Sequence, residues 1–305
     1  MKILFLTPNQ QSKWNNGHDL FRQRIGKMHE IKYCGPGFDG YNVGPFNARA
    51  AEMMYKPEFI MTYGMKYTWQ FHSLKECIMP TVHFLCDYIP AIPNTDFKGY
   101  VTQYDSLLAR DDYDLIFCLT RRAMQACKDS GVKAKFEYLP FGIDPMIFQP
   151  LVDVEQTYDV GTMFHHHIVY PNRKEIEGAL MGSGLRILKE NRYLGDYVYA
   201  INQCKVMVIS LNYWKSFGSR ILEAMACGTM VITERPEDYR SMGLVNERNI
   251  VYYGDTTDML EKVNYFIQHE DERQAIAAAA RELVLKRHTN EHRVKEMTAK
   301  LQRFV

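Results

Sequence analysis

The feature that most constrains the fold is a series of short, uninterrupted apolar runs that alternate with helical stretches in both halves of the chain. A strand with one wet face alternates apolar and polar residues, whereas a strand covered on both faces is apolar throughout. These runs are of the second kind and are predicted to be buried strands. The predicted strands are Lys2–Thr7, Phe59–Thr62, Thr81–Leu85, Asp114–Thr120, Tyr158–Met163, Lys205–Leu211, Thr229–Thr233 and Asn249–Tyr253.

The stretches between the runs have helical patterns, such as Thr120–Ser130 and Ser219–Cys227. Alternation of strand and helix in both halves predicts an α/β fold with two Rossmann-like, doubly wound parallel sheets facing a cleft. The chain from Asp258 onward has a helical pattern and predicts a helical C-terminal tail. Ligands of such folds bind at the carboxyl ends of the strands, so residues just after each predicted strand are the candidates for a site.

The boundary between the halves is visible in Leu139–Pro150 (LPFGIDPMIFQP), which holds three prolines and one glycine. Proline ends regular elements and stiffens a connection. We therefore expect one domain over residues 1–149, a second over residues 150–288, and a separate C-terminal helix over residues 289–305.

Charge and cysteine content exclude several classes of protein. The 305 residues contain 37 Lys plus Arg and 36 Asp plus Glu, a net charge of +1, which argues against a surface that binds nucleic acid or anionic membrane everywhere. The seven cysteines contain no CxxC pair and predict reduced thiols in the cytoplasm. The apolar run at the N-terminus is too short for a signal peptide, and no run is long enough for a membrane span.

The most informative segment is 206–233, a predicted strand, loop, helix and strand. The first backbone N–H groups of a helix lack internal partners and, with the helix dipole, bind anions. Gly218, just before the predicted helix start at Ser219, lets a phosphate approach the backbone, and Lys215 and Arg220 add positive charge. Glu223 lies one turn further along, where a carboxylate accepts hydrogen bonds from a ribose diol.

The sequence FGSRILEAMACGTMVIT in this segment resembles the donor-binding motif of the retaining GT-B glycosyltransferases of group 1 (family 4-like). The resemblance is closest to the spore-maturation CgeB-like group and extends to LPFGIDPMIFQP and residues 248–294. It implies that the donor nucleotide is bound by Phe217, Gly218, Ser219, Arg220 and Glu223, with Glu223 on the ribose. The common family pattern has a glutamate eight positions before the second one. Lys215 stands there in this chain.

Further candidates follow two other predicted strands. In similar transferases a basic residue after the strand at 158–163 contacts the diphosphate, a role that Arg173 fits; the alternative is a solvated helix start. Asp87 follows Thr81–Leu85 and is predicted to orient the acceptor or stabilise positive charge on the sugar; the alternative is a turn or cap aspartate. With Lys215, these two are the predicted catalytic residues. His83 is expected in the core, and the consecutive histidines at 165–167 do not have metal-ligand spacing.

Together these features predict a glycosyltransferase that takes a sugar from a nucleotide-diphosphate sugar, with a UDP-sugar as the expected donor. The resemblance implies retention of configuration, no required metal or cofactor, acceptor binding by residues 1–149, donor binding by residues 150–288, and docking of residues 289–305 on the N-terminal domain. The acceptor is left open among a small molecule, a glycan, a protein and a modified DNA base of phage type. The alternatives are a nucleotide-sugar epimerase of the same fold and a non-catalytic nucleotide-sugar-binding protein. A nicotinamide dehydrogenase is disfavoured because no G-x-G-x-x-G follows the first predicted strand.

Overall fold

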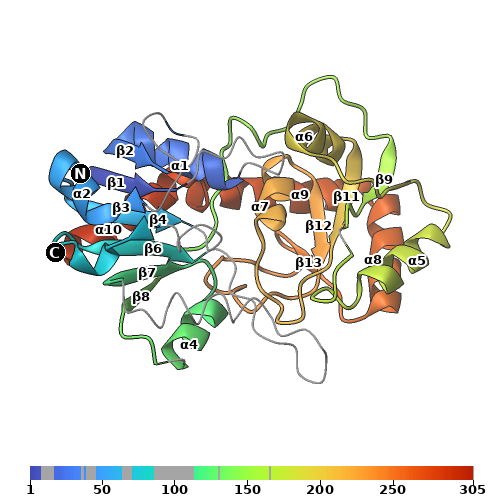
Figure 1. Ribbon diagram of the computed structural model, residues 1–305. Helices are drawn as coiled ribbons and strands as arrows, with labels where there is room; N and C mark the ends of the chain where they lie inside the picture. The colour runs from blue at the N-terminus through green and yellow to red at the C-terminus, as the bar shows by residue number, and fades with distance from the viewer. Residues whose placement is uncertain are drawn as a thin grey trace. The chain divides into compact units, whose positions relative to one another are not determined.

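The structure is a computed structural model that describes residues 1–7, 17–35, 38, 46–63, 71–85, 113–129, 131–164 and 166–304. The chain divides into two units (Figure 1). The first comprises Met1–Gln11, Arg22–Pro140 and Val294–Val305, and the second comprises Ser12–Phe21 and Phe141–Arg293. The boundaries expected from the sequence, after residues 149 and 288, stay predictions.

The first unit is built on a parallel sheet with the strand order β2-β1-β4-β6-β7-β8. A separate short parallel pair joins β3 to β5. The strands are β1 (Lys2–Leu6), β2 (Glu30–Cys34), β3 (Phe46–Asn47), β4 (Phe59–Tyr63), β5 (Phe71–His72), β6 (Thr81–Leu85), β7 (Leu115–Cys118) and β8 (Lys135–Tyr138). The helices are α1 (Gly17–Met28), α2 (Ala48–Tyr55), the 3-10 helix η2 (Leu74–Glu76), α4 (Arg121–Asp129) and α10 (Asn290–Phe304), of which α1 and α10 also run into the second unit.

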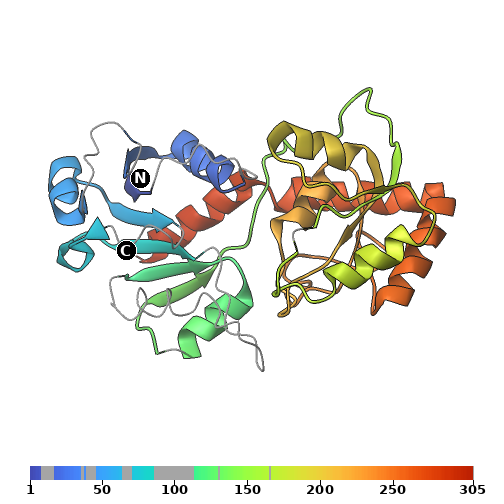
Figure 2. The same cartoon turned by 45° about the vertical axis from the view of Figure 1, so that its right-hand side comes forward.

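Both faces of this sheet are covered, as its apolar strands require. Leu4 and Leu6 point to the face where Ala123 and Cys127 of α4 pack. Figure 2 shows α4 beside the strands of this sheet. On the other face Phe5 stacks 6.4 Å from Phe84, between ring centres.

The second unit holds a five-stranded parallel sheet with the order β10-β9-β11-β12-β13. The order shows that the chain turns back across β9 when it leaves β10 for β11. The strands are β9 (Tyr158–Gly161), β10 (Ile187–Leu188), β11 (Cys204–Ile209), β12 (Met230–Thr233) and β13 (Val251–Tyr252). The helices are α5 (Arg173–Met181), α6 (Leu194–Asn202), α7 (Ser219–Ala226), α8 (Thr256–Gln268) and α9 (Glu270–Arg287).

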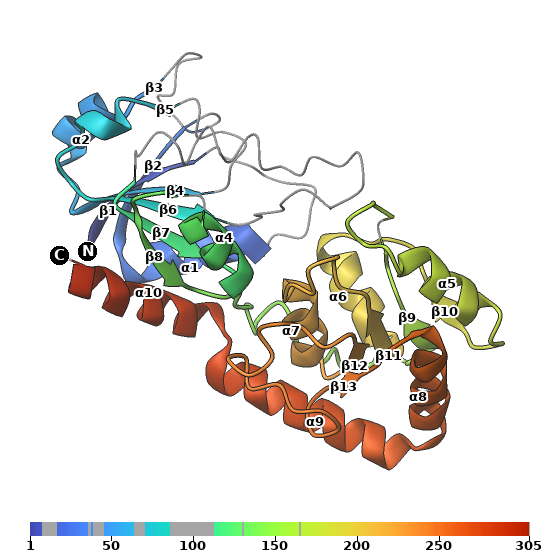
Figure 3. The same ribbon diagram turned by 90° about the horizontal axis from the view of Figure 1, so that it is seen from below.

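Alternate residues of β11 show that helices cover both faces of this sheet. Met207 and Ile209 belong to a core with residues of α6 and α7, whereas Val206 and Val208 belong to a core with residues of α5 and α8. The long helix α9 contributes to both cores, and Figure 3 shows it running past α7 to meet α8. Side chains that alternate in a strand point to opposite faces, so both faces are dry.

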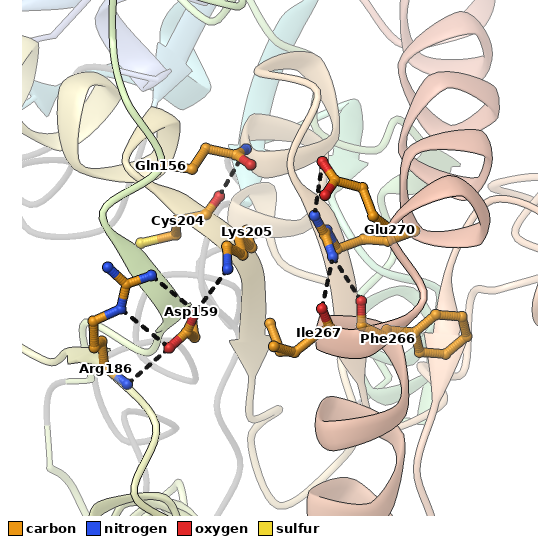
Figure 4. Close-up of polar contacts among 9 residues, drawn as sticks. Gln156, Asp159, Arg186, Cys204, Lys205, Phe266, Ile267 and Glu270 are labelled. Carbon is orange, nitrogen blue, oxygen red and sulfur yellow. Dashed lines mark hydrogen bonds and ion pairs between the residues drawn. The ribbon is translucent and has the colours of Figure 1, made fainter.

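Ionic contacts tie the amino ends of the second sheet together (Figure 4). Asp159 of β9 accepts hydrogen bonds from Arg186 Nη2 at 3.2 Å and from Lys205 Nζ of β11 at 2.9 Å. Burial raises the pKa of Asp159, but these hydrogen bonds outweigh it and lower the pKa to about 2. In the same view Phe266 and Ile267 present the last carbonyls of α8, of which the Phe266 oxygen accepts from Arg273 Nη1 at 2.7 Å.

The predicted fold class is confirmed: two Rossmann-like parallel sheets are followed by C-terminal helices. All eight predicted strands are present, with ends that agree or are shifted by at most two residues. The sequence pattern did not predict β2, β3, β5, β8 and β10. β2 (EIKYC) and β8 (KFEY) are edge strands in which charged and apolar residues alternate, so they lack an apolar run.

Candidate functional site

The strand order of the second sheet marks the place for a ligand. β10 lies on one side of β9 and β11 on the other, so the connections after β9 and β11 diverge at the carboxyl ends of these two strands. Ligands of open α/β sheets bind at such switch points. The residues to examine are therefore those between β9 and α5, and those between β11 and α7.

A hydrogen bond joins these two connections. Arg220 Nη1 of α7 donates to the carbonyl oxygen of Met163, which follows β9, at 2.7 Å. Met163 has a φ of +42°, a left-handed conformation that is uncommon for a residue with a side chain. The guanidinium of Arg220 is thereby fixed next to the start of α7.

The space in front of α7 is open at its first residue. Gly218 is the N-cap, with an extended backbone (φ −116°, ψ 153°) that any residue can adopt. A Cβ built on Gly218 would meet no heavy atom within 4 Å. The glycine is therefore not required by the packing of the described residues, and the helix start has room for a ligand group beside its N–H donors.

Glu234, directly after β12, holds the connections in place. Its buried carboxylate accepts hydrogen bonds from Leu211 N at 2.6 Å and from Asn172 Nδ2 at 2.9 Å, and it forms an ion pair with Lys215. Glu234 was not among the residues predicted from the sequence. The available signal was its position immediately after the predicted strand Thr229–Thr233.

Arg173 is the first residue of α5, next to Asn172, and is 6% exposed. Its guanidinium carbon lies 3.3 Å from the centre of the Tyr170 ring and 5.1 Å from that of Phe164. Burial lowers the pKa of Arg173 to about 10, and the charge of Arg220 acts in the same direction, so the group stays protonated at neutral pH. Its pKa also responds to the charge of Glu234.

The structure thus groups three of the predicted cations with two carboxylates. Lys215 pairs with Glu234, whose charge also acts on Arg173, while Arg220 acts on Arg173 and on the carboxylate of Glu223. Three cations and two carboxylates leave a net positive charge at a switch point, beside the start of a helix, which suits an anionic ligand.

Glu223 and Phe217 lie deeper than the other predicted residues. The carboxylate of Glu223 is 2% exposed and accepts a hydrogen bond from Tyr197 Oη at 2.9 Å. Burial raises the pKa of Glu223, and the hydrogen bonds from Ser219 and Tyr197 oppose that rise. The side chain of Phe217 packs in the core, which leaves its backbone as the part that can contact a ligand.

Other predicted residues are placed elsewhere or not described. Asp87 and His165 lie outside the described residues. His166 Nε2 lies 2.7 Å from Glu177 Oε2, in an ion pair if the ring is protonated. His83 is fully buried beside Thr62 Oγ1, and burial lowers its pKa to about 3, so it is the neutral core histidine that was predicted.

Within the part of the chain that the structure describes, no group of three or more His, Cys, Asp or Glu is arranged to hold a metal ion. None of the described helices combines the length and the apolar character that crossing a bilayer demands.

Known proteins resemble the chain in sequence over part of its length and in fold over nearly all of it. Residues 162–299 match the family model described as "Glycosyl transferase-like". No curated protein matches in sequence. Three similar solved structures are sucrose-phosphate synthase from Thermosynechococcus elongatus (13% identity, TM-score 0.73, 99% of each chain), HepE from Anabaena with UDP and glucose (13%, 0.73, 99% of this chain and 100% of that one) and a glycosyltransferase from Rickettsia africae (13%, 0.72, 99% and 98%).

At 13% identity the structural likeness establishes the fold. The family match begins at Thr162, directly after β9, and so includes the loops that carry Arg173, Lys215 and Arg220. The chain therefore has the fold of the GT-B glycosyltransferases, and its residues 162–299 are similar in sequence to the glycosyl transferase-like family.

Proposed function

We propose that the protein transfers a sugar from a nucleotide-diphosphate sugar, with UDP-sugar as the donor, to an acceptor. The observation that carries the proposal is the surplus of positive charge formed by Arg173, Lys215 and Arg220 at the switch point of the second sheet. A diphosphate would neutralise this surplus and meet the first N–H groups of α7 at Gly218. The complex of Anabaena HepE with UDP-glucose, a structure with the same fold, supports this choice of donor.

The difficult part of sugar transfer is the departure of the nucleoside diphosphate, on which negative charge grows. Fixed cations and helix N–H donors stabilise that charge without having to reorganise. Removing one such donor raises a barrier by about 2.7–4 kcal/mol in comparable sites. Retention of configuration, independence from metal and membership of the CgeB-like group belong to the same proposal and rest on the resemblance of residues 217–233.

Glu223 binds the ribose in this proposal. Tyr197 holds one carboxylate oxygen, and a ribose hydroxyl would take the place of the Ser219 hydroxyl on the carboxylate. Asp87 acts on the acceptor side, residues 1–149 bind the acceptor, residues 150–288 bind the donor, and residues 289–305 dock on the N-terminal domain. Each of these assignments is part of the proposal.

Calorimetric titration of the full chain with UDP and UDP-glucose tests the site. We expect Gly218→Ala to weaken UDP binding at least tenfold, because the added methyl group enters the space assigned to the diphosphate. Gly178→Ala is the matched control, since a Cβ there also meets no atom within 4 Å and the residue lies inside α5, away from the helix starts. Equal UDP affinity for wild type and Gly218→Ala would overturn the placement of the diphosphate.

Activity is tested separately from binding. Incubation with labelled UDP-glucose and a panel of acceptors, read by mass spectrometry, should yield a glycosylated product. A changed sugar from donor alone would instead indicate the epimerase. Tight UDP-glucose binding without any product would favour the non-catalytic nucleotide-sugar-binding protein. This alternative is worth testing because the carboxylate of Glu223 already accepts a hydrogen bond from Tyr197 within the protein.

A further inference from the structure

The second unit has a hollow that lies outside the proposed diphosphate site. It has a volume of about 780 Å³ and lies at the ends of β12 and β13. Its lining includes three cations and three tyrosines, and none of the described residues that line it is a carboxylate. A hollow of this size suits an organic ligand rather than a single ion. The residues that matter are Arg235, Tyr239, Arg240, Tyr252, Tyr253 and Lys262.

Arg235 and Arg240 share the ring of Tyr239. Their guanidinium carbons lie 5.3 and 5.5 Å from its centre, and Arg240 Nε donates to Tyr239 Oη at 2.9 Å. Both arginines are exposed, and neither has an ion pair with another described residue. Lys262 differs, because it donates to Asp258 at 2.8 Å and to the Tyr252 carbonyl at 2.7 Å.

Tyr252 supplies an unused hydrogen-bond donor at the same place. Its ring meets that of Tyr239 edge to face, with centres 6.4 Å apart. Its hydroxyl oxygen is buried and has no hydrogen-bond partner among the described residues. Burial raises the pKa of Tyr252, so the hydroxyl keeps its proton and can donate to an anion.

A smaller hollow of about 400 Å³ adjoins the first and shares Gly243 and Val245 with it. It is lined by Arg248 and by Lys286 and Arg287 at the end of α9, against one carboxylate, Glu282. The two adjoining hollows therefore present six cations and one lining carboxylate, and Lys262 among these cations is paired with Asp258 outside the lining. Glu237, Asp238 and Glu247 belong to the same stretch of chain but line neither hollow.

We propose that these two hollows, here called the basic track, bind a strand of nucleic acid, and that the sugar acceptor is carried on that strand. The second clause rests on the proposed function. A surface that combines cations with a partly exposed aromatic ring, as Tyr239 is here, binds phosphodiesters through charge and bases through stacking. Since the net charge of the chain is only +1, the positive charge of the track is a local feature and not a property of the whole surface.

Fluorescence anisotropy with a labelled single-stranded DNA of twelve nucleotides tests the proposal, using the full chain with UDP present at saturation. We expect Arg235→Gln/Arg240→Gln to weaken binding at least tenfold and to reduce the slope of log K against log salt by about 1.4, the value for two phosphate contacts on a single strand. Tyr239→Leu keeps the charge and should weaken binding about tenfold through lost stacking.

Lys27→Gln/Lys128→Gln is the matched control, because it removes the same charge from exposed helix positions of the first unit. Unchanged DNA binding by the arginine pair variant would overturn the proposal. Equal affinity for heparin, or displacement of the DNA by AMP as readily as by unlabelled strand, would also overturn it. The proposed function has its own readouts, since its failure would appear in wild type as absent UDP binding, or as UDP-glucose binding without a glycosylated product, whatever the DNA result.

Discussion

The two ends of the second sheet use charge in different ways. At the amino end Asp159 is paired with Arg186 and Lys205, and the charge of Glu155 also acts on Arg186, so two carboxylates balance two cations. At the carboxyl end three cations, Lys215, Arg173 and Arg220, are accompanied by two carboxylates, Glu234 and Glu223. The amino end thus has its charges balanced within the protein, whereas the carboxyl end keeps a net positive charge that an anionic ligand would neutralise.

Two of the cations at the carboxyl end lie at helix starts, where the helix dipole disfavours positive charge. Arg173 is the first residue of α5 and Arg220 the second of α7, where the helix dipole is positive and a cation is unfavourable. A protein selected for stability alone would place acidic residues there. Local choices that oppose stability are expected at functional sites, which supports an anion as the missing partner.

The largest effect that separates the two ends is expected in catalysis. Lys215→Met should lower kcat/KM for sugar transfer about 100–1000-fold, because a fixed cation at the leaving group is lost. Lys205→Met is the matched change at the amino end and should leave kcat/KM within about twofold while lowering Tm. Steady-state kinetics and thermal melts of both variants measure this. Similar kinetic losses in the two variants would remove the distinction between the ends.

A medium effect is expected in stability. Asp159→Asn should lower the free energy of unfolding at pH 7 by about 2 kcal/mol, because charge-assisted hydrogen bonds to Arg186 and Lys205 are weakened. The folded pKa of about 2 lies below the ordinary 3.8, so this contribution is present above pH 3.8 and is lost as the pH falls through 2. Urea unfolding at several pH values should show that the difference in free energy of unfolding between wild type and variant disappears as the pH falls from 4 to 2. A difference that does not change with pH would contradict the pairing of Asp159 with Arg186 and Lys205.

The smallest effect concerns the pH dependence of donor binding. In the proposed function, ribose recognition requires the ionised carboxylate of Glu223, and burial raises the pKa of this carboxylate above the ordinary 4.5. UDP affinity should therefore fall on acidification at a pH above 4.5, and Glu223→Gln should bind more weakly without this dependence. Titrations between pH 5 and 8 give the profile. If Glu223→Gln lost as much UDP affinity on acidification as wild type does, this carboxylate would be excluded as the source of the pH dependence.

Sequence patterns predicted the centre of each sheet better than its margins. Central strands such as β6 and β12 are buried on both faces, so their residues are uniformly apolar and easy to recognise. Edge strands such as β2 and β8 are half exposed, and their charged residues resemble those of loops. Strand order, which creates the switch point, is not encoded in any local pattern.

The candidate site was predicted in part. Gly218 and Arg220 were predicted from helix-start chemistry, because their positions relative to α7 depend on neighbours along the chain. Their roles in binding a ligand stay predictions. Glu234 was missed because its partners, Asn172, Leu211 and Lys215, come from segments up to 62 residues away. For the same reason the burial of Phe217 and the bond from Tyr197 to Glu223 could not be anticipated from a motif.

The position of Glu234 has a consequence for how this protein can evolve. One carboxylate is shared by Asn172 before α5 and by Leu211 and Lys215 in the connection from β11 to α7, so a substitution in either loop alters the anchoring of the other. Changes here should show strong epistasis. Attempts to redesign sugar preference by exchanging a single loop would fail more often than exchanges that transplant both loops together with the acidic residue.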